Sequence, residues 1–254
     1  MFKTMLKDIV YSVRRLCVRK KNSAIVLVYH SVGRNGLRFT VTPEMFEHQM
    51  AWLNKEKFNV VSLDKLTGYM DAGSIPPKTL AITFDDGYRD NIIEAFPVLK
   101  RYGFPATIFL TVSDLGKSRD VRGVPLEILS EEELRHLESS GLVLIEPHTV
   151  THPKLTQVPD ATIEQEITQS KKTIEGILNK NCIHFAYPKG RYNDAVLEII
   201  SHTGIKYGYT TINGFVTPKS SHYEIPRNGI TSDTTMAQFK GIALAGRVTL
   251  ENFV

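Results

Sequence analysis

Two adjacent carboxylates could do chemistry in this chain. Asp85 and Asp86 follow an apolar run in the segment TFDDG at residues 83–87. Two acidic groups at the end of a buried strand are costly unless an opposite charge compensates them, and a metal cation would do so. Aspartates before a glycine are also common in solvated turns. The pair therefore predicts either a cation site or an ordinary strand-to-loop turn.

Two histidines four residues apart, His148 and His152, could share a metal ion. On a helix this spacing would fit a zinc protease, but Thr149 stands where that motif needs a glutamate. The intervening residues are β-branched and prolines flank the segment, so a loop after a strand is expected. Two histidines, a carboxylate and water form a common open zinc site. The alternative is two ordinary surface or core histidines.

Two further segments end apolar runs with polar residues. His30 closes the stretch VYH at residues 28–30, and Tyr187, Pro188 and Lys189 lie in a Pro/Gly turn. A lone histidine is more often structural, and such a turn is typical of a simple βα loop. The sequence has no Walker A motif and no GxGxxG after a strand, so nothing supports a nucleotide site.

The elements that must position these residues alternate along the chain. The predicted strands are Ala24–His30, Asn59–Leu63, Leu80–Phe84, Ala106–Thr111, Leu142–Ile145, Ile183–Tyr187, Lys206–Thr210 and Tyr223–Pro226. The predicted helices are Pro43–Lys55, Asp90–Tyr102, Ser130–Ser140, Asp160–Asn179, Asp194–Thr203 and one from Thr234. Repeated β-α units predict an α/β fold with a parallel sheet covered by helices. About seven units favour a closed barrel, in which catalytic residues gather at the carboxyl ends of the strands.

The composition excludes several classes of protein. The chain has 254 residues, of which 42% are hydrophobic and 23% charged, values typical of a globular domain. Its two cysteines argue against a disulfide scaffold, and no apolar run is long enough for a transmembrane helix. Residues 1–23 carry seven basic residues and one acidic residue, which leaves residues 24–254 with a net charge of −2. No nucleic-acid partner is therefore expected.

Residues 1–23 are predicted to form a segment separate from the domain at 24–254. Their apolar residues recur at helical spacing between basic ones, as in a basic amphipathic helix. Such a helix can lie on an anionic membrane surface or pack on the domain with its charges in water. No clean apolar run precedes a cleavage site. We expect a cytoplasmic protein that can bind peripherally to the inner membrane face.

Together these motifs resemble those of the polysaccharide deacetylase family, also called the NodB-homology or carbohydrate esterase family 4 domain. The resemblance covers about residues 24–230 and rests on TFDDG followed by HTxxHP at residues 148–153. It implies a distorted (β/α)7 barrel in a single catalytic domain. It also implies that Asp86, His148 and His152 bind one divalent metal ion, Zn²⁺ first and Co²⁺, Ni²⁺ or Fe²⁺ as alternatives, and that Asp85 is the catalytic base.

The chain departs from the pattern of this family at its third motif, which reads Arg-x-Pro-aromatic. Ala186 stands where the arginine belongs and Lys189 where the aromatic residue belongs. The arginine normally orients the catalytic aspartate, and Arg227 is a candidate substitute. Tyr187, Pro188, Lys189 and Arg227 itself remain candidates for contacts with the substrate or its oxyanion.

The C-terminal Leu-x-His motif of the family is also missing. Leu27 and the residues up to His30 offer it at the start of the chain instead. This order is similar to that of the circularly permuted subgroup that acts on poly-N-acetylglucosamine, and it implies that His30 is the general acid. The motif of the family that contains an aspartate and a tryptophan has no clear match, because the only tryptophan, Trp52, falls on an early helix.

The resemblance implies a hydrolase that removes an acetyl group from an N-acetylated sugar of a polysaccharide, glycan or lipid-linked precursor. Its partner would be that N-acetylated glycan or lipid-linked sugar, and its products acetate and a free amino sugar. Two alternatives stay open. The same site could cleave an O-acetyl ester, and Ala186 and Lys189 are compatible with a glycan-binding protein whose catalytic site has decayed.

Overall fold

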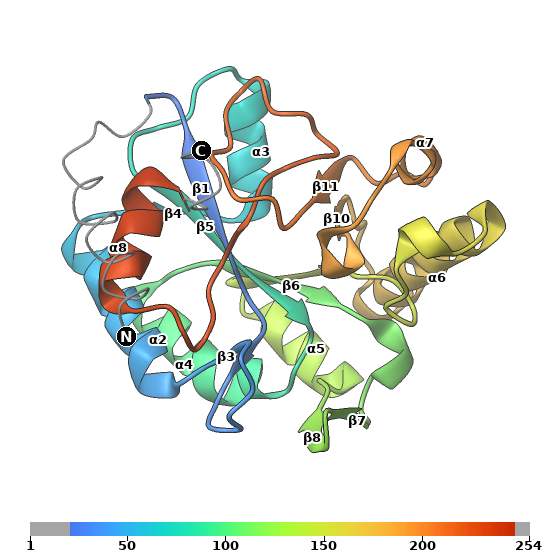
Figure 1. The fold of residues 1–254 in the computed structure, drawn as a ribbon, viewed down its shortest axis with the longest axis horizontal. Helices are drawn as coiled ribbons and strands as arrows, with labels where there is room; N and C mark the ends of the chain where they lie inside the picture. Colours follow the sequence, from blue (N-terminus) through green and yellow to red (C-terminus); the bar gives the residue numbers. More distant parts are fainter. Residues whose placement is uncertain (1–20, 247–254) are drawn as a thin grey trace, which may run out of the picture.

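A mostly parallel sheet runs through the centre of the fold, as the computed structural model of residues 21–246 shows (Figure 1). Its strands are β1 (Ala24–Tyr29), β2 (Ser31–Val32), β3 (Thr40–Val41), β4 (Asn59–Val60), β5 (Thr79–Asp86), β6 (Ala106–Leu110), β7 (Ser118–Val121), β8 (Val124–Glu127), β9 (Val143–Pro147), β10 (His184–Ala186), β11 (Tyr207–Tyr209) and β12 (Asn228–Gly229). The main sheet has the order β12-β1-β5-β6-β9, and β4 also pairs with β5. Every residue of β1 and β5 is buried, as expected for parallel strands covered on both faces.

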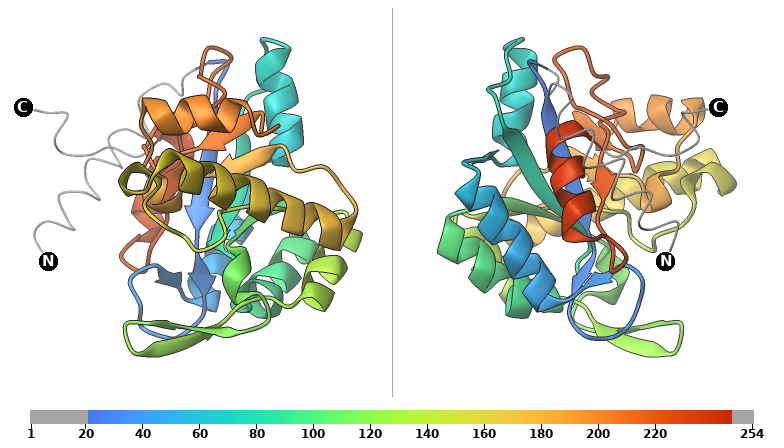
Figure 2. Two further views of the ribbon diagram at one scale, coloured as in Figure 1. Left: turned by 90° about the vertical axis from the view of Figure 1, so that its right-hand side faces the viewer. Right: turned by 60° about the vertical axis from the view of Figure 1, so that its left-hand side comes forward.

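Helices cover this sheet on two sides. They are α2 (Pro43–Lys55), α3 (Leu63–Asp71), α4 (Phe96–Tyr102), α5 (Glu131–Ser139), α6 (Asp160–Leu178), α7 (Asp194–Ser201) and α8 (Met236–Ala245), with a π-helical turn η1 (Asn91–Ala95) before α4. Helices α2, α4 and α8 lie along one side, and α6 and α7 lie along the other (Figures 1 and 2). The capping box predicted at Ser130 is present, because its side chain accepts from the N–H of Glu133 and the Glu133 carboxylate accepts from the N–H of Ser130.

The ring of strands is interrupted between β9 and β10. Strands β10 and β11 pair with each other, and a single bridge joins Tyr209 to Ile225 on the way to β12. At the interruption, Glu146 Oε2 accepts hydrogen bonds from the backbone N–H groups of Ile183 (3.1 Å) and His184 (2.9 Å). A buried side chain thus supplies acceptors that a neighbouring strand would otherwise provide. The predicted distorted (β/α) barrel is confirmed in this form.

Most predicted elements are present, but several short ones were missed. Helix α3 and strands β2, β3, β7, β8 and β12 were not expected. The strand predicted at Asn59–Leu63 ends at Val60, because Ser62 caps α3 by accepting a hydrogen bond from the N–H of Lys65. The strand predicted at Tyr223–Pro226 is wrong, since that segment contributes only the bridge at Ile225.

Two further expectations concern the N-terminal segment and membrane-spanning helices. The basic amphipathic helix was predicted for residues 1–23, most of which lie outside the described residues. No helix in the described part of the chain is long and apolar enough to cross a membrane.

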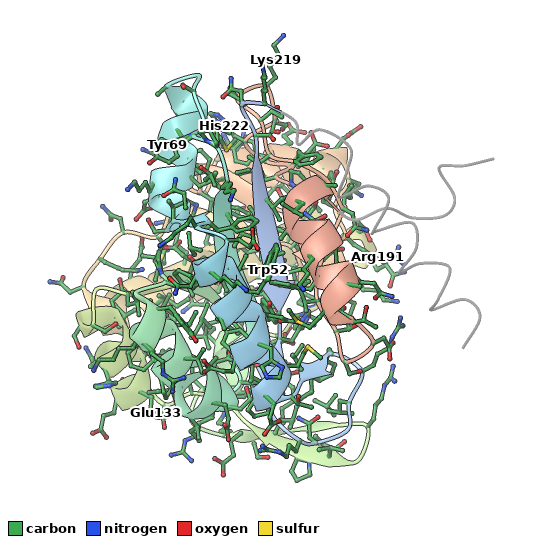
Figure 3. All side chains as sticks on the ribbon, turned by 90° about the vertical axis from the view of Figure 1, so that its left-hand side faces the viewer. Trp52, Tyr69, Glu133, Arg191, Lys219 and His222 are labelled. Carbon is green, nitrogen blue, oxygen red and sulfur yellow. The ribbon has the colours of Figure 1, made fainter. Side chains whose placement is uncertain are left out.

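Trp52 is half-buried between Phe58 and Phe239 of α8, with ring centroids 5.3 and 5.9 Å away (Figure 3). It therefore packs from α2 against the edge of the hydrophobic core.

Candidate active site

Asp85 and Asp86 occupy the carboxyl end of the buried strand β5, and both are buried. Successive residues of a strand normally point to opposite faces. Asp86 has a φ of +73°, in the left-handed region, which ends this alternation, and Gly87 follows with a φ of +78°. A Cβ at Gly87 would lie 2.4 Å from Leu110 Cδ1, so only glycine fits there. This backbone conformation explains why a glycine follows Asp85 and Asp86.

Arg227 holds the carboxylate of Asp85. It donates from Nη1 to Oδ1 at 2.6 Å and from Nη2 to Oδ2 at 2.8 Å. Its Nε donates to the carbonyl oxygen of Thr210 at 2.9 Å, and its guanidinium lies 5.2 Å from the ring centroid of Phe109. Both members of the pair are buried. Such a bidentate contact fixes the orientation of a carboxylate and stabilises its ionised form.

Asp86, His148 and His152 form a cluster with the donor set of a metal site. One ligand atom from each lies within 4.8 Å of the others. His148 Nδ1 is 2.7 Å from the carbonyl oxygen of Ala186, so this nitrogen carries the proton and Nε2 is free to bind. Two imidazoles and one carboxylate, with room for water, match the ligands of an open catalytic site for a divalent metal. The residues present therefore fit such an ion.

The loop that carries both histidines is held in a strained conformation. Thr149 and His152 have φ values of +69° and +59°, and a β-branched residue rarely adopts such a value. The buried carboxylate of Glu166 on α6 accepts from the N–H groups of Val150 (2.7 Å) and Thr151 (2.9 Å). Thr149 Oγ1 accepts from the N–H of His152 at 3.0 Å. These contacts keep the two imidazoles on the same side of the loop.

The ionisation of the cluster suits metal binding. Burial would raise the pKa of Asp86, but the charges of His30, His148 and His152 outweigh it, and the pKa is lowered. Burial lowers the pKa of His148, and burial together with His148 lowers the pKa of His152 to about 4. At neutral pH the carboxylate is therefore charged and the imidazoles are neutral, which is the state that binds metals.

Asp85 is also ionised at neutral pH. Burial alone would raise its pKa, but the guanidinium of Arg227 more than offsets burial and holds the pKa well below its usual range. The charge of His148 acts in the same direction. The site thus contains two buried carboxylates with different partners, since Asp86 faces the histidines while Asp85 is bound to an arginine.

A cavity of about 810 Å³ opens in front of this cluster. Asp86, His152 and the half-buried His30 all line it, so the histidine at the end of β1 faces the same space as the metal-ligand set. The other lining residues are Leu37, Arg38, Phe39, Tyr88, Arg119, Val121, Arg122, Lys189 and Thr231. The cavity has the size of a small-ligand site and brings together residues at or after the ends of β1, β5, β9, β10 and β12.

Comparison with known proteins identifies the family. The sequence profile of polysaccharide deacetylases matches residues 72–208, more than half of the chain. The chain belongs to the polysaccharide deacetylase family. A poly-β-1,6-N-acetyl-D-glucosamine N-deacetylase of Staphylococcus aureus (strain MSSA476) is 30% identical over 237 residues, which cover 84% of this chain and 81% of that protein.

Solved structures have the same fold. The Streptococcus pyogenes deacetylase PplD, in complex with acetate, superposes with a TM-score of 0.75 at 25% identity, covering 86% of this chain and 97% of that one. IcaB from Ammonifex degensii superposes with a TM-score of 0.77 at 22% identity, covering 89% and 99%. These similarities extend over nearly the whole barrel of the deacetylase and not only over its motifs.

The residues of the third motif divide between the cavity and the core. Lys189 lines the cavity of this deacetylase. Tyr187 does not, because its side chain is fully buried in a hydrophobic cluster and its hydroxyl donates to the carbonyl oxygen of Tyr223 at 3.0 Å. Pro188 is buried too. The side chains of Tyr187 and Pro188 therefore pack in the interior, and their contact with the substrate or its oxyanion stays a prediction.

Arg227 is also completely buried. It donates to Asp85 from Nη1 and Nη2, the contact for which it is the candidate substitute. His222 lies away from the cavity, beside α3, with its Nε2 3.2 Å from Asp71 Oδ1 (Figure 3). The histidine at the start of the chain, His30, is thus the one that the fold brings to the site.

Sequence reasoning missed two side chains that shape the site of the deacetylase. Glu166 holds the histidine loop, and Arg119 lines the cavity with its Nη1 3.5 Å from Asp86 Oδ1. Arg119 lies on the hairpin β7–β8, whose turn is marked only by Arg122-Gly123 between two valines. That short turn signal could have predicted the hairpin, but nothing in the sequence shows that it reaches the site.

Proposed function

We propose that this polysaccharide deacetylase is a metal-dependent N-deacetylase that removes the acetyl group from an N-acetylated sugar of a polysaccharide, glycan or lipid-linked precursor. The observation that carries the proposal is the cluster of Asp86, His148 and His152 beside the ionised Asp85. The activity in the printed name of the Staphylococcus aureus relative, N-deacetylation of poly-β-1,6-N-acetyl-D-glucosamine, supports the same chemistry here.

The side chains divide the reaction between them. A divalent metal ion held by Asp86, His148 and His152, with Zn²⁺ the first choice, would polarise the acetyl carbonyl and make water more acidic. Asp85, oriented by Arg227, accepts the proton of the attacking water. His30 donates a proton to the nitrogen that leaves. The backbone N–H of Lys189 is the candidate donor to the developing oxyanion.

The overall change is a balanced hydrolysis. The oxygen of water forms a bond to the acetyl carbon, and the bond between that carbon and the sugar nitrogen breaks. Both protons of the water end on the sugar nitrogen, which becomes an ammonium group, and the acetyl group is released as acetate. An amine is a poor leaving group until it is protonated, so the acid at His30 matters as much as the base at Asp85.

An O-acetyl glycan esterase is the second candidate, because the same metal ligands and base can attack an ester. An alkoxide leaves more readily than an unprotonated amine, so ester cleavage depends less on an acid. The half-buried imidazole of His30 in the cavity favours the amide reaction. A decayed glycan-binding site is less consistent with the geometry, since Arg227 supplies the contact to Asp85 that Ala186 lacks.

Metal content tests the proposal directly. Purified wild-type protein, reconstituted with Zn²⁺, is expected to retain about one equivalent of metal by elemental analysis. Asp86→Ala and His148→Ala should lose it. His222→Ala is the matched control, because this exposed histidine also has a carboxylate partner but lies outside the cluster. Wild-type protein without bound metal after reconstitution, or full retention in both site variants, would overturn the mechanism.

A further inference from the structure

The wall of the active-site cavity beyond the metal-ligand set is positively charged. Arg38, Arg119, Arg122 and Lys189 line the cavity, and among residues 21–246 Asp86 is its only lining carboxylate. Residues 24–254 as a whole carry a net charge of −2. Four cations thus face one carboxylate in the wall of this cavity, and their combined field favours an anion there.

Two of these cations are neutralised and two are not. Arg119 Nε is 2.6 Å from Asp114, and Arg38 Nε is 2.8 Å from Asp233. Arg122 and Lys189 are both exposed, and within residues 21–246 neither has a carboxylate oxygen within the 4.0 Å of an ion pair. Their charges are available to a group that enters the cavity.

Both free cations are also held in a strained backbone conformation. Arg122 has a φ of +56° and Lys189 a φ of +57°, values that favour glycine and asparagine. Arg122 and Gly123, with a φ of +82°, form the two-residue turn between β7 and β8, where Asn-Gly would be the least strained choice. These two cations thus lie in the cavity wall despite a backbone conformation that disfavours them.

The loops that carry Arg122 and Arg38 lie at one end of the molecule. The hairpin β7–β8 lies beside the segment with β2 and β3, at the lower edge of the fold in two views (Figures 1 and 2). Arg38 and Phe39 come from that second segment and share the cavity with Arg122. A ligand in the cavity would thus contact both loops.

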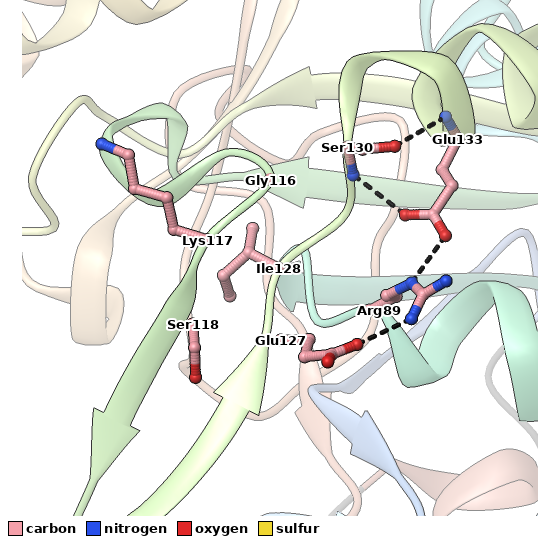
Figure 4. Close-up of a pocket in the computed structure, with 8 residues that line it drawn as sticks. All are labelled: Arg89, Gly116, Lys117, Ser118, Glu127, Ile128, Ser130 and Glu133. Carbon is pink, nitrogen blue, oxygen red and sulfur yellow. Dashed lines mark hydrogen bonds and ion pairs between the residues drawn. The ribbon is translucent and has the colours of Figure 1, made fainter.

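A second cavity, also at the hairpin, is lined by an arginine whose charge is neutralised. This space of about 350 Å³ is on the hairpin as well, and Arg89 lines it together with Glu127 and Glu133 (Figure 4). Arg89 Nη1 is 2.7 Å from Glu127 and its Nε is 2.6 Å from Glu133. Two carboxylates thus satisfy the guanidinium, in contrast to Arg122 and Lys189.

We propose that the cation-lined wall binds an anionic group, a phosphate or a carboxylate, that the acetylated glycan carries next to the sugar to be cleaved. The inference rests on the proposed N-deacetylase function and names its substrate class. Arg122 and Lys189 can each bind such a group, and arginine matches the geometry of phosphate and carboxylate oxygens. A neutral glycan gains no charge–charge attraction from these cations, and the ammonium product is repelled by them.

Matched oligosaccharides test the proposal. The set is a neutral N-acetylglucosamine trisaccharide, the same trisaccharide with one phosphate, and one with a single carboxylate. We expect wild-type protein to bind the anionic compounds about tenfold more tightly than the neutral one at low salt, with the difference shrinking as salt rises. Calorimetry measures binding, and acetate release measures kcat/KM. A preference for the phosphate or for the carboxylate identifies which anion the wall recognises.

Two variants separate a binding role from a structural one. Arg122→Asn removes the charge and gives the turn its favoured Asn-Gly sequence, so thermal stability should be kept or raised while the anion preference falls at least threefold. Lys219→Gln removes an exposed cation that does not line the cavity, and the preference should be unchanged (Figure 3).

The outcomes distinguish this inference from the proposed function. Equal binding of neutral and anionic trisaccharides, or an unchanged preference in Arg122→Asn, overturns the anion site. Preferential binding of the anionic compounds without acetate release from any of them upholds the site and counts against the N-deacetylase function. Tight binding and turnover of the neutral compound alone upholds the function and rejects the anionic substrate.

Discussion

At the residue scale, two neighbouring carboxylates of the site have different partners and different tasks. Asp85 is bound to Arg227 on both oxygens, whereas Asp86 faces His148 and His152. One carboxylate can therefore hold a metal ion while the other is kept ionised by an arginine and can accept a proton. Arg227 lies 142 positions from Asp85 in the chain, so this pairing depends on the closure of the barrel.

Replacing Arg227 should change the pH dependence of the reaction. In Arg227→Met, burial acts on Asp85 without its counter-charge, so the pKa of Asp85 should rise. Because the reaction needs the ionised carboxylate, the acid limb of the kcat/KM profile should move to higher pH. An uncompensated buried charge should also reduce stability by roughly 3–5 kcal/mol. Arg227→Lys keeps the charge and should move the limb less, and an unmoved limb in Arg227→Met would argue against the pairing as the cause.

Replacing His30 should separate amide from ester cleavage. In His30→Ala, hydrolysis of an N-acetyl sugar is expected to fall by about 10²–10⁴-fold, the usual contribution of a general acid. Hydrolysis of an O-acetyl ester should fall much less, because its alkoxide leaving group depends less on protonation by an acid. Both rates are measured as acetate release. An amide rate equal to that of wild type would remove His30 from the mechanism.

At the element scale, the interruption between β9 and β10 is bridged by the side chain of Glu146. Its carboxylate accepts two backbone N–H groups of the entry to β10, and Lys180 Nζ lies 3.3 Å from its other oxygen. The next loop on this side carries His148, whose Nδ1 binds the carbonyl oxygen of Ala186 at the end of β10. The bridge thus supports the same pair of strand ends that orients a metal-binding histidine.

Removing the bridge should destabilise the barrel. Glu146→Ala leaves the buried N–H groups of Ile183 and His184 without their acceptor, and we expect a loss of about 2–4 kcal/mol in the free energy of unfolding. Glu146→Gln retains a carbonyl oxygen as acceptor and should cost less. Urea denaturation measures both. Equal stability of the two variants would mean that the charge on Glu146 matters and the backbone contacts do not.

At the scale of the whole molecule, charge is unevenly distributed. Residues 1–23 hold seven basic residues and one acidic residue, while the remainder of the chain has a net charge of −2. The cations that the domain does place together line the active-site cavity. We propose that residues 1–23 bind the inner face of the cytoplasmic membrane and that the domain acts on a glycan or lipid-linked sugar presented there.

Deleting residues 1–23 tests the membrane proposal. The full chain should pellet with vesicles that contain anionic lipid, with each basic residue near the surface contributing about 1 kcal/mol, and pelleting should weaken as salt rises. The shortened chain should stay in the supernatant and keep its rate of acetate release. Vesicles of neutral lipid are the control. Pelleting that survives the deletion would place the membrane contact elsewhere.

The sequence by itself determined what depends on short-range order. The buried strands, the helices between them and the two segments with Asp85, Asp86, His148 and His152 follow from local residue type and spacing. They are predictable because hydrophobic periodicity and helix caps act over a few positions. The missed elements, α3 and the hairpin β7–β8, have weak or short signals of that kind.

Only the tertiary structure decided how these parts meet. Arg227 reaches Asp85, and Glu166 supports the histidine loop, through contacts that no spacing in the chain encodes. Tyr187 was expected to contact the substrate and is buried, whereas Arg119 and Arg122 were not expected at the cavity and line it. The reason is physical: a local pattern specifies which face of an element is apolar, but which side chains share a cavity depends on how distant elements pack.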